Sequence, residues 1–141
     1  MLYCVVETDR FEVKRHMEFL SHSVTETEAL GQRLGQALHP GDVVAYFGDL
    51  GAGKTAFTRG FTAAVSPSAA VRSPTYTVVN EYRGGPLPIF HFDMYRIEDG
   101  DELASIGFED YLAKDGYILC EWSENIREDI PDDALLITVR R

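Results

Sequence analysis

The segment Gly48–Thr55 limits what this chain can fold into more than any other part of the sequence. It reads GDLGAGKT and matches the pattern G-x-x-x-x-G-K-[ST] at every fixed position. Such a loop turns its backbone N–H groups inward around a polyphosphate, and glycines permit the turn because they carry no Cβ. A mostly apolar run, Asp42–Phe47, precedes the loop and a helical stretch, Lys54–Val65, follows it. This context favours a P-loop over a chance glycine turn.

The residue types of the loop give each position an expected role. The helix that starts near Lys54 directs the positive end of its dipole toward a bound anion. The Lys54 ammonium group is expected to contact the β- and γ-phosphates, and the Thr55 hydroxyl to bind Mg²⁺. The sequence therefore predicts ATP and Mg²⁺ as cofactors. The backbone positions expected to bind the nucleotide are Gly48, Asp49, Leu50, Gly51, Ala52 and Gly53.

Two acids are candidates for a further magnesium anchor, which usually lies at the end of a neighbouring strand. Asp93 ends the run Leu87–Asp93, and Glu121 ends the run Tyr117–Glu121. Either acid alone could instead be a solvated residue at a strand end. Trp122, which follows Glu121, is either a site residue or part of the core. Which acid dominates at the metal stays open.

The loop between the P-loop helix and the next strand is rich in hydroxyl groups. It reads Ser73-Pro74-Thr75-Tyr76-Thr77, and it could cover the γ-phosphate or simply connect two elements. In the predicted strand Leu87–Asp93, the side chains of Ile89, His91 and Asp93 share one face because strand side chains alternate. For His91, a structural role with satisfied hydrogen bonds is favoured over a role in the site.

The remaining patterns predict an α/β fold like that of the P-loop NTPases, with three layers, a mostly parallel central sheet and an antiparallel hairpin. Thr25 and Glu28 fit a capping box at the start of a helix that ends before Pro40-Gly41. The other elements are expected as a hairpin around Gly84-Gly85 with strands Thr77–Arg83 and Leu87–Asp93, short helices at Asp99–Ile106 and Phe108–Leu112, and a last strand at Ala134–Arg140.

Size, charge and cysteine usage bound the function class. The 141 residues suit one domain, which we expect over 23–141, with 1–22 as an N-terminal extension or Met17 as the true start. A net charge of -10 with scattered basic residues argues against autonomous nucleic-acid binding. No apolar run is long enough to span a membrane. Cys4 and Cys120 lack the spacing of a metal or redox pair, which favours the cytoplasm.

Four segments taken together resemble the TsaE family. They are GDLGAGKT at 48–55, SPTYT at 73–77, HFDMYR at 91–96 and EW at 121–122. The resemblance implies a P-loop ATPase that is needed for threonylcarbamoyladenosine modification of tRNA next to the anticodon. It also implies action with the TsaB and TsaD proteins, ATP hydrolysis that is slow in the protein alone, and contact with tRNA only through that complex.

The resemblance also implies roles for individual residues. Thr55 and Glu121 correspond to the magnesium-binding positions, and Asp93 to a Walker-B-like aspartate that is a third candidate ligand. The residues that it places in catalysis are Lys54, Thr75, Asp93 and Glu121. Those that it places at the nucleotide, besides the loop, are Ser23 and Thr25 near the adenine and Trp122 beside the acid. Tyr95 lies in a segment that looks functional in relatives, and many relatives continue beyond Arg141 into another strand.

Two other functions stay open. A small-molecule P-loop kinase would normally carry an arginine-bearing lid, and no segment is long enough for one. A GTPase is disfavoured because the N-K-x-D motif is missing. A non-catalytic switch, in which ATP binding alone assembles a complex, cannot be separated from an ATPase by sequence. No residue stands out as an arginine finger, although Arg59, Arg83 and Arg96 are candidates.

Overall fold

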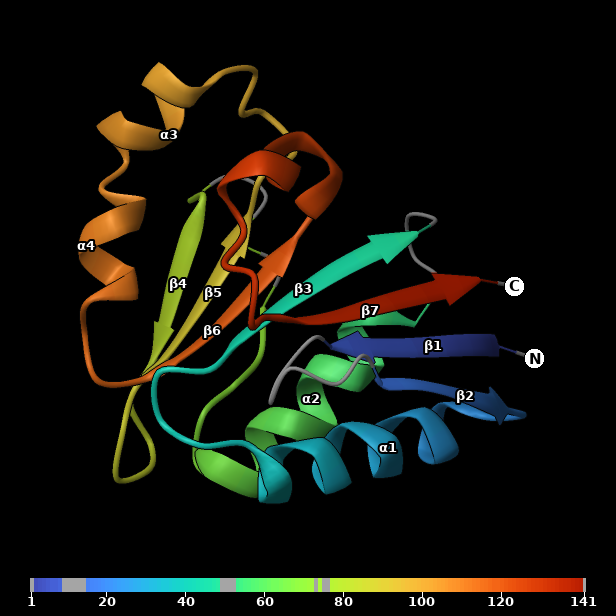
Figure 1. Cartoon of the computed structure of the whole chain (residues 1–141). Helices are drawn as coiled ribbons and strands as arrows, with labels where there is room; N and C mark the ends of the chain where they lie inside the picture. Colours follow the sequence, from blue (N-terminus) through green and yellow to red (C-terminus); the bar gives the residue numbers. More distant parts are fainter. Residues whose placement is uncertain (1, 9–14, 49–52, 73, 75–76, 141) are drawn as a thin grey trace.

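The computed structural model describes residues 2–8, 15–48, 53–72, 74 and 77–140. Within these ranges the chain forms one seven-stranded sheet with the strand order β2-β1-β7-β3-β6-β5-β4 (Figure 1). The strands are β1 (Leu2–Thr8), β2 (Arg15–Ser21), β3 (Val43–Gly48), β4 (Val79–Tyr82), β5 (Ile89–Asp93), β6 (Tyr117–Glu121) and β7 (Leu135–Arg140).

The four central strands of the sheet, β7, β3, β6 and β5, are parallel to one another. The edges are antiparallel: β4 pairs with β5 on one side, while β1 pairs with β7 and β2 with β1 on the other. The predicted hairpin is therefore present as β4 and β5. The carboxyl ends of the parallel strands meet at one edge, the place where open α/β sheets bind ligands.

Helices cover both faces of the sheet, so the predicted three-layer α/β fold is confirmed (Figure 1). The helices α1 (Val24–Ala37) and α2 (Lys54–Val65) pack on one face. The short helices α3 (Gly100–Ser105) and α4 (Phe108–Leu112) and the 3₁₀ segment η2 (Ser123–Asp129) lie on the other. Among the described residues, no helix is both long and apolar enough to cross a bilayer.

The alternation of β5 divides the core into two clusters. Ile89 belongs to the cluster under α1 and α2, together with Tyr46 and Phe61. Phe90 and Phe92 belong to the cluster under α3 and α4. A strand that is apolar on both faces is expected where helices cover both sides of a parallel sheet. The face assignment of β5 from sequence is confirmed.

The N-terminus of α1 differs from its prediction by two residues. The N-cap is Ser23, whose hydroxyl accepts a hydrogen bond from the Glu26 backbone N–H at 3.1 Å. The Glu26 carboxylate in turn accepts from the His22 backbone N–H at 2.6 Å. The expected box of Thr25 and Glu28 is therefore wrong. Ser23 is the N-cap because the helix begins at Val24. The Ser-x-x-Glu pattern is therefore formed by Ser23 and Glu26, two residues before the predicted pair.

Two glycines allow α1 and α2 to cross closely. A Cβ on Gly31 would collide with the backbone carbonyl of Phe57, and a Cβ on Gly60 would collide with the carbonyl of Glu28. Small residues at such a crossing let the helix backbones touch. This contact fixes α2, and with it the residue Lys54 at its start, relative to the rest of the helical layer.

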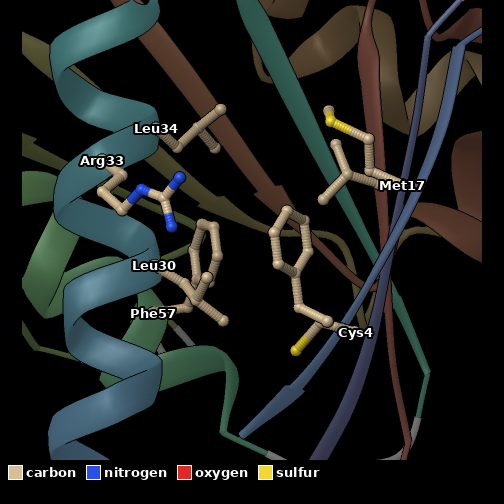
Figure 2. Close-up of a pocket in the computed structure, with 8 residues that line it drawn as sticks. Cys4, Met17, Leu30, Arg33, Leu34 and Phe57 are labelled. Atoms are coloured by element: carbon tan, nitrogen blue, oxygen red, sulfur yellow. The ribbon is translucent and has the colours of Figure 1, made fainter.

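The first strands of the chain belong to the sheet, which the sequence did not reveal. Residues 1–16 show little pattern, and residues 1–22 were expected as an extension, yet β1 pairs along both β2 and β7. Cys4 and Val6 of β1 are buried in the core beneath α1. An apolar cavity of about 200 Å³ remains between these strands and α1, lined also by Met17 and Phe57 (Figure 2). The domain boundary at residue 23 stays a prediction.

Candidate nucleotide site

The structure holds both ends of the P-loop as the sequence predicts. Gly48 is the last residue of β3, and Gly53 is the N-cap of α2 with a left-handed backbone at φ 93°. Among the described residues no side chain caps this helix, so within them the N–H groups of its first turn have no side-chain acceptor. Such a helix start suits a phosphate. Asp49, Leu50, Gly51 and Ala52 lie outside the described residues.

Lys54 is held in a defined place although it carries a charge. Its residue is only 2% exposed. Its ammonium nitrogen donates to the Gly48 carbonyl at 3.4 Å and lies 5.1 Å from the centroid of the Trp122 ring. A cation rarely stays buried without partners. The described partners here are one carbonyl and one aromatic face, so an anion at the loop would be a stronger partner for Lys54.

Asp93 and Glu121 stand side by side at the carboxyl ends of β5 and β6, where they are register partners. The segments beyond them are tied together. The Met94 backbone N–H donates to the Glu121 carbonyl at 3.0 Å, and the Asn125 side chain donates to the carbonyls of Met94 and Tyr95 at 2.9 and 3.1 Å. The two acids predicted from strand ends are therefore brought together.

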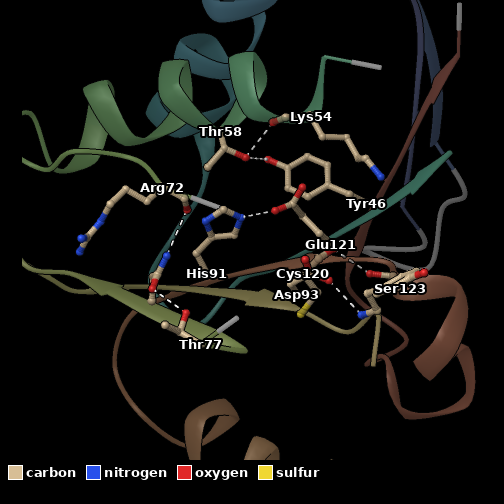
Figure 3. Close-up of polar contacts among 12 residues, drawn as sticks. Tyr46, Lys54, Thr58, Arg72, Thr77, His91, Asp93, Cys120, Glu121 and Ser123 are labelled. Atoms are coloured by element: carbon tan, nitrogen blue, oxygen red, sulfur yellow. Dashed lines mark hydrogen bonds and ion pairs between the residues drawn. The ribbon is translucent and has the colours of Figure 1, made fainter. Parts of the chain in front are cut away.

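The carboxylates differ in what they contact. Asp93 is 7% exposed, and its Oδ1 accepts from the Tyr95 backbone N–H at 2.9 Å, which forms a local turn. The Glu121 side chain is 13% exposed, and its Oε2 lies 2.7 Å from Nε2 of His91 (Figure 3). Nδ1 of His91 lies 3.0 Å from the Tyr82 hydroxyl. His91 thus has the satisfied hydrogen bonds that the sequence analysis favoured, and one of its partners is a predicted site residue.

The buried side chain of Tyr46 packs beneath the start of α2. The Thr58 hydroxyl lies within hydrogen-bond distance of two groups, the Lys54 carbonyl at 2.9 Å and the Tyr46 hydroxyl at 3.3 Å. Burial, aided by the nearby negative charge of Glu121, raises the pKa of the Tyr46 phenol well above its usual range. Tyr46 therefore stays neutral and fills the space between β3 and α2 without adding charge (Figure 3).

Trp122 turns the chain sharply at the end of β6. It has a left-handed backbone, with φ 56° and ψ 41°, and serves as the N-cap of η2. The Ser123 hydroxyl supports this turn by donating to the Cys120 carbonyl at 2.8 Å. The indole packs against the Tyr95 ring, with 5.0 Å between centroids. The sole tryptophan thus lies between Lys54 and Tyr95, and it also packs on the core under α3 and α4.

The donor set fits Mg²⁺ better than a metal with an all-protein shell. Thr55 is exposed in the first turn of α2, and Asp93 and Glu121 supply hard carboxylate oxygens. The part of the chain that the structure describes contains no group of three or more histidine, cysteine or acidic side chains arranged to hold a metal. Mg²⁺ is usually held by one or two protein ligands together with phosphate and water. Thr55 and Glu121 would hold it, with Asp93 close by.

Three other predicted positions have different outcomes. Ser23 caps α1, and Thr25 is exposed in the first turn of that helix. The start of α1 lies at the same end of the molecule as the end of β3 (Figure 1). Their described contacts remain within β2 and α1, so a contact with adenine stays a prediction. Thr75 lies outside the described residues. Its loop begins after Arg72, whose backbone N–H donates to the Tyr82 hydroxyl at 3.1 Å.

Sequence reasoning missed the contribution of η2 to the loop. The Glu124 carboxylate accepts from the Gly48 backbone N–H at 3.3 Å, and the Arg127 guanidinium lies 4.6 Å from the centroid of the Phe47 ring. These residues line a cleft of about 430 Å³ that reaches Thr138 on β7. The only signal in the sequence was their closeness to Glu121, because no periodic pattern marks a 3₁₀ segment.

Two of the candidate arginines form ion pairs on the protein surface. The guanidinium of Arg59 lies 3.9 Å from Glu28, and that of Arg83 lies 2.8 Å from Glu81. Both arginine side chains are more than half exposed. Exposed pairs of this kind contribute little to stability.

Comparison with known proteins identifies the family. A family model described as threonylcarbamoyl adenosine biosynthesis protein TsaE matches residues 21–141. The tRNA threonylcarbamoyladenosine biosynthesis protein TsaE of Bacillus subtilis is 41% identical over 116 residues, which are 82% of this chain and 72% of that protein. The protein of the same name from Haemophilus influenzae is 44% identical over 92 residues, 65% of this chain and 58% of the relative.

A solved structure agrees with this result. The crystal structure of Bacillus subtilis YdiB superposes with a TM-score of 0.70 at 34% identity, covering 84% of this chain and 72% of that one. The matched residues 21–141 include the P-loop, both strand-end acids and Trp122. This chain belongs to the TsaE family of threonylcarbamoyl adenosine biosynthesis proteins.

Proposed function

We propose that this protein binds ATP with Mg²⁺ and hydrolyses it slowly to support threonylcarbamoyladenosine formation in tRNA, acting in the cytoplasm with TsaB and TsaD. The observation that carries the proposal is the placement of Lys54 at the start of α2, with its ammonium group over Trp122, together with Glu121 and Asp93 at two adjacent strand ends. Residues 23–141 would form the ATPase domain.

The proposed roles follow from the chemistry of each group. The P-loop backbone and Lys54 would hold the phosphates, and Thr55 and Glu121 would hold Mg²⁺. The metal would supply charge neutralisation at the β- and γ-phosphates. Asp93 would orient water around this centre, because its carboxylate lies beside Glu121 and is tied to the Tyr95 backbone. Thr75 would approach the γ-phosphate from the loop that precedes β4.

Slow hydrolysis by the protein alone is supported by the surroundings of two candidate arginines. Transfer of a phosphoryl group is greatly accelerated when a guanidinium reaches the transferring phosphate. Arg59 and Arg83 are instead exposed and paired with acids of their own chain. We infer that the TsaB–TsaD complex supplies a guanidinium to the phosphate and also binds the tRNA, since this chain has a net charge of -10.

The test is phosphate release by the purified protein, alone and with TsaB, TsaD and tRNA, measured beside threonylcarbamoyladenosine formed over many turnovers. We expect slow release alone, faster release with the partners, and loss of both activities in Lys54→Ala. Release in isolation on the order of 1–100 s⁻¹, as in kinases, would contradict the partner dependence. Modification that needs ATP binding but proceeds without phosphate release would favour the non-catalytic switch instead.

A further inference from the structure

A chain of hydrogen bonds crosses three adjacent strands and ends on Glu121. Tyr82 of β4, His91 of β5 and Glu121 of β6 each contribute one group (Figure 3). The links are 3.0 Å from the Tyr82 hydroxyl to Nδ1 of His91 and 2.7 Å from Nε2 of His91 to Glu121. Tyr82 and His91 are 4% and 2% exposed. A polar chain this well buried is costly unless every member is satisfied.

The donors and acceptors fix the role of Nε2. An ionised Glu121 carboxylate can only accept, so Nε2 of His91 donates to it. The Tyr82 hydroxyl has one hydrogen and two groups within reach, Nδ1 of His91 at 3.0 Å and the Arg72 carbonyl at 2.9 Å. The Tyr82 oxygen also accepts from the Arg72 backbone N–H at 3.1 Å. Tyr82 is therefore held to the Arg72 backbone and contacts the far side of the His91 ring.

These hydrogen bonds restrict the side chain of Glu121. Glu121 has a long side chain at the end of a strand, and without a partner it would sample several rotamers in the partly open site. His91 cannot move in the same way, because its ring lies in the core beside Tyr82, at 5.9 Å between ring centroids. The Glu121 side chain points toward the layer of Tyr46 and α2 (Figure 3).

We propose that His91 is a positioning residue that holds the Glu121 carboxylate in the orientation needed for Mg-ATP, and that Tyr82 holds the His91 ring in place from its other side. This inference rests on the proposed function, since it assumes that Glu121 serves the magnesium. Groups that hold a metal ligand from behind set its orientation, and their loss typically lowers metal affinity or activity about 10–100-fold.

Two substitutions at one position separate the two hydrogen bonds. The amide nitrogen of glutamine can take the place of Nε2, so His91→Gln keeps the bond to Glu121. Asparagine reaches only the place of Nδ1, so His91→Asn keeps a partner for Tyr82 and leaves Glu121 unsupported. Ser66→Ala is the matched control, because it removes a buried hydrogen bond, to the Gly84 backbone N–H at 2.7 Å, at the far end of α2.

The measurement is ATP binding by calorimetry over a series of Mg²⁺ concentrations and again in EDTA, with thermal unfolding as a check on folding. We expect His91→Asn to raise the Mg²⁺ midpoint at least about tenfold, with metal-free ATP affinity unchanged. His91→Gln and Ser66→Ala should keep the wild-type midpoint. Equal shifts in Asn and Gln variants, or no shift in the Asn variant, would overturn the inference.

The remaining outcomes are also decisive. If His91→Asn does not fold, Tyr82→Phe replaces it, since this variant keeps the ring and removes only the hydroxyl that orients His91. A wild-type Mg²⁺ midpoint in Tyr82→Phe would then reject the positioning role. A wild-type protein whose ATP binding does not depend on Mg²⁺ would instead reject the proposed function, whatever the His91 variants do.

Discussion

The ammonium group of Lys54 lies over the indole of Trp122, 5.1 Å from the ring centroid. A cation over an aromatic face is stabilised by about 0.5–2 kcal/mol. A triphosphate attracts the same cation with charge-assisted hydrogen bonds that are stronger. The Lys54–Trp122 contact is therefore one that a bound nucleotide would replace, and Trp122 is placed to report the change.

Addition of Mg-ATP is expected to change the intrinsic fluorescence of the protein. The chain has one tryptophan, so the signal comes from Trp122 alone. The indole should lose its contact with the Lys54 cation when the phosphates bind. A titration followed by emission intensity and wavelength measures this change. Lys54→Ala should show the altered spectrum without ATP and respond little to it. An unchanged spectrum at saturating Mg-ATP, with binding verified by calorimetry, would contradict the prediction.

Replacement of Lys54 by alanine is expected to weaken ATP binding about ten- to hundredfold. Hydrogen bonds to charged groups contribute about 1.5–3 kcal/mol, which is one to two powers of ten in Kd. Calorimetric titration with ATP measures the change. The fold should persist, and Arg59→Ala on an exposed turn of the same helix is the control. Equal affinities of the wild type and Lys54→Ala would remove Lys54 from the site.

The two strand-end acids should respond differently to neutralisation. Glu121→Gln is expected to raise the Mg²⁺ concentration needed for ATP binding and to lower phosphate release by at least about tenfold. Asp93→Asn keeps an oxygen for the Tyr95 backbone N–H, so its fold should persist, and its effect should fall mainly on hydrolysis. Phosphate release against Mg²⁺ concentration separates the two. Normal turnover in Glu121→Gln would move the metal to Asp93.

Gly60→Ala is expected to destabilise the protein by about 1–3 kcal/mol, because the added methyl group meets the Glu28 carbonyl where α1 and α2 cross. The matched variant is Gly100→Ala in the first turn of α3, where the new Cβ meets no atom within 4 Å apart from its chain neighbours and its own helix backbone. This change should be neutral or stabilising by up to about 1 kcal/mol. Urea unfolding of both variants measures the difference. Equal free energies of unfolding in the two variants would show that α1 and α2 can move apart to accommodate the methyl group at little cost.

Both cysteines should resist a thiol reagent in the native protein. Burial raises the pKa of the Cys4 thiol and of the Cys120 thiol, so little thiolate forms near neutral pH. Cys4 lies one strand from one edge of the sheet and Cys120 two strands from the other, so Cys4 should react at lower urea concentrations. Mass spectrometry of labelled peptides follows both sites. Labelling of Cys120 at a lower urea concentration than Cys4 would contradict the prediction that the sheet unfolds first near β1.

Elements fixed by local signals could be predicted closely. The bounds of α2 match the prediction from Lys54 to Val65, and those of β6 match from Tyr117 to Glu121. In both cases a motif or an apolar run with clear ends marks the element. The pairing of Asp93 with Glu121 could also be anticipated, because parallel strands bring their carboxyl ends together.

Features that depend on distant partners could not be predicted. The strand β1 gains its order from β7 at the other end of the chain, and β2 carries Arg15, His16 and Glu18 among its apolar residues. Neither segment shows a period that identifies a strand by itself. The contact of His91 with Glu121 joins residues thirty positions apart. Only the register of the sheet reveals that it exists.

The strand that carries the P-loop must wait for the rest of the chain to be synthesised. Both neighbours of β3 come late: Val43 pairs with Ile118 and Val44 with Leu135. Until β6 and β7 have left the ribosome, β3 has no hydrogen-bonded partner in the sheet, and Glu121 is not yet beside Asp93. A nascent chain therefore lacks the proposed nucleotide site until β6 and β7 have paired with β3.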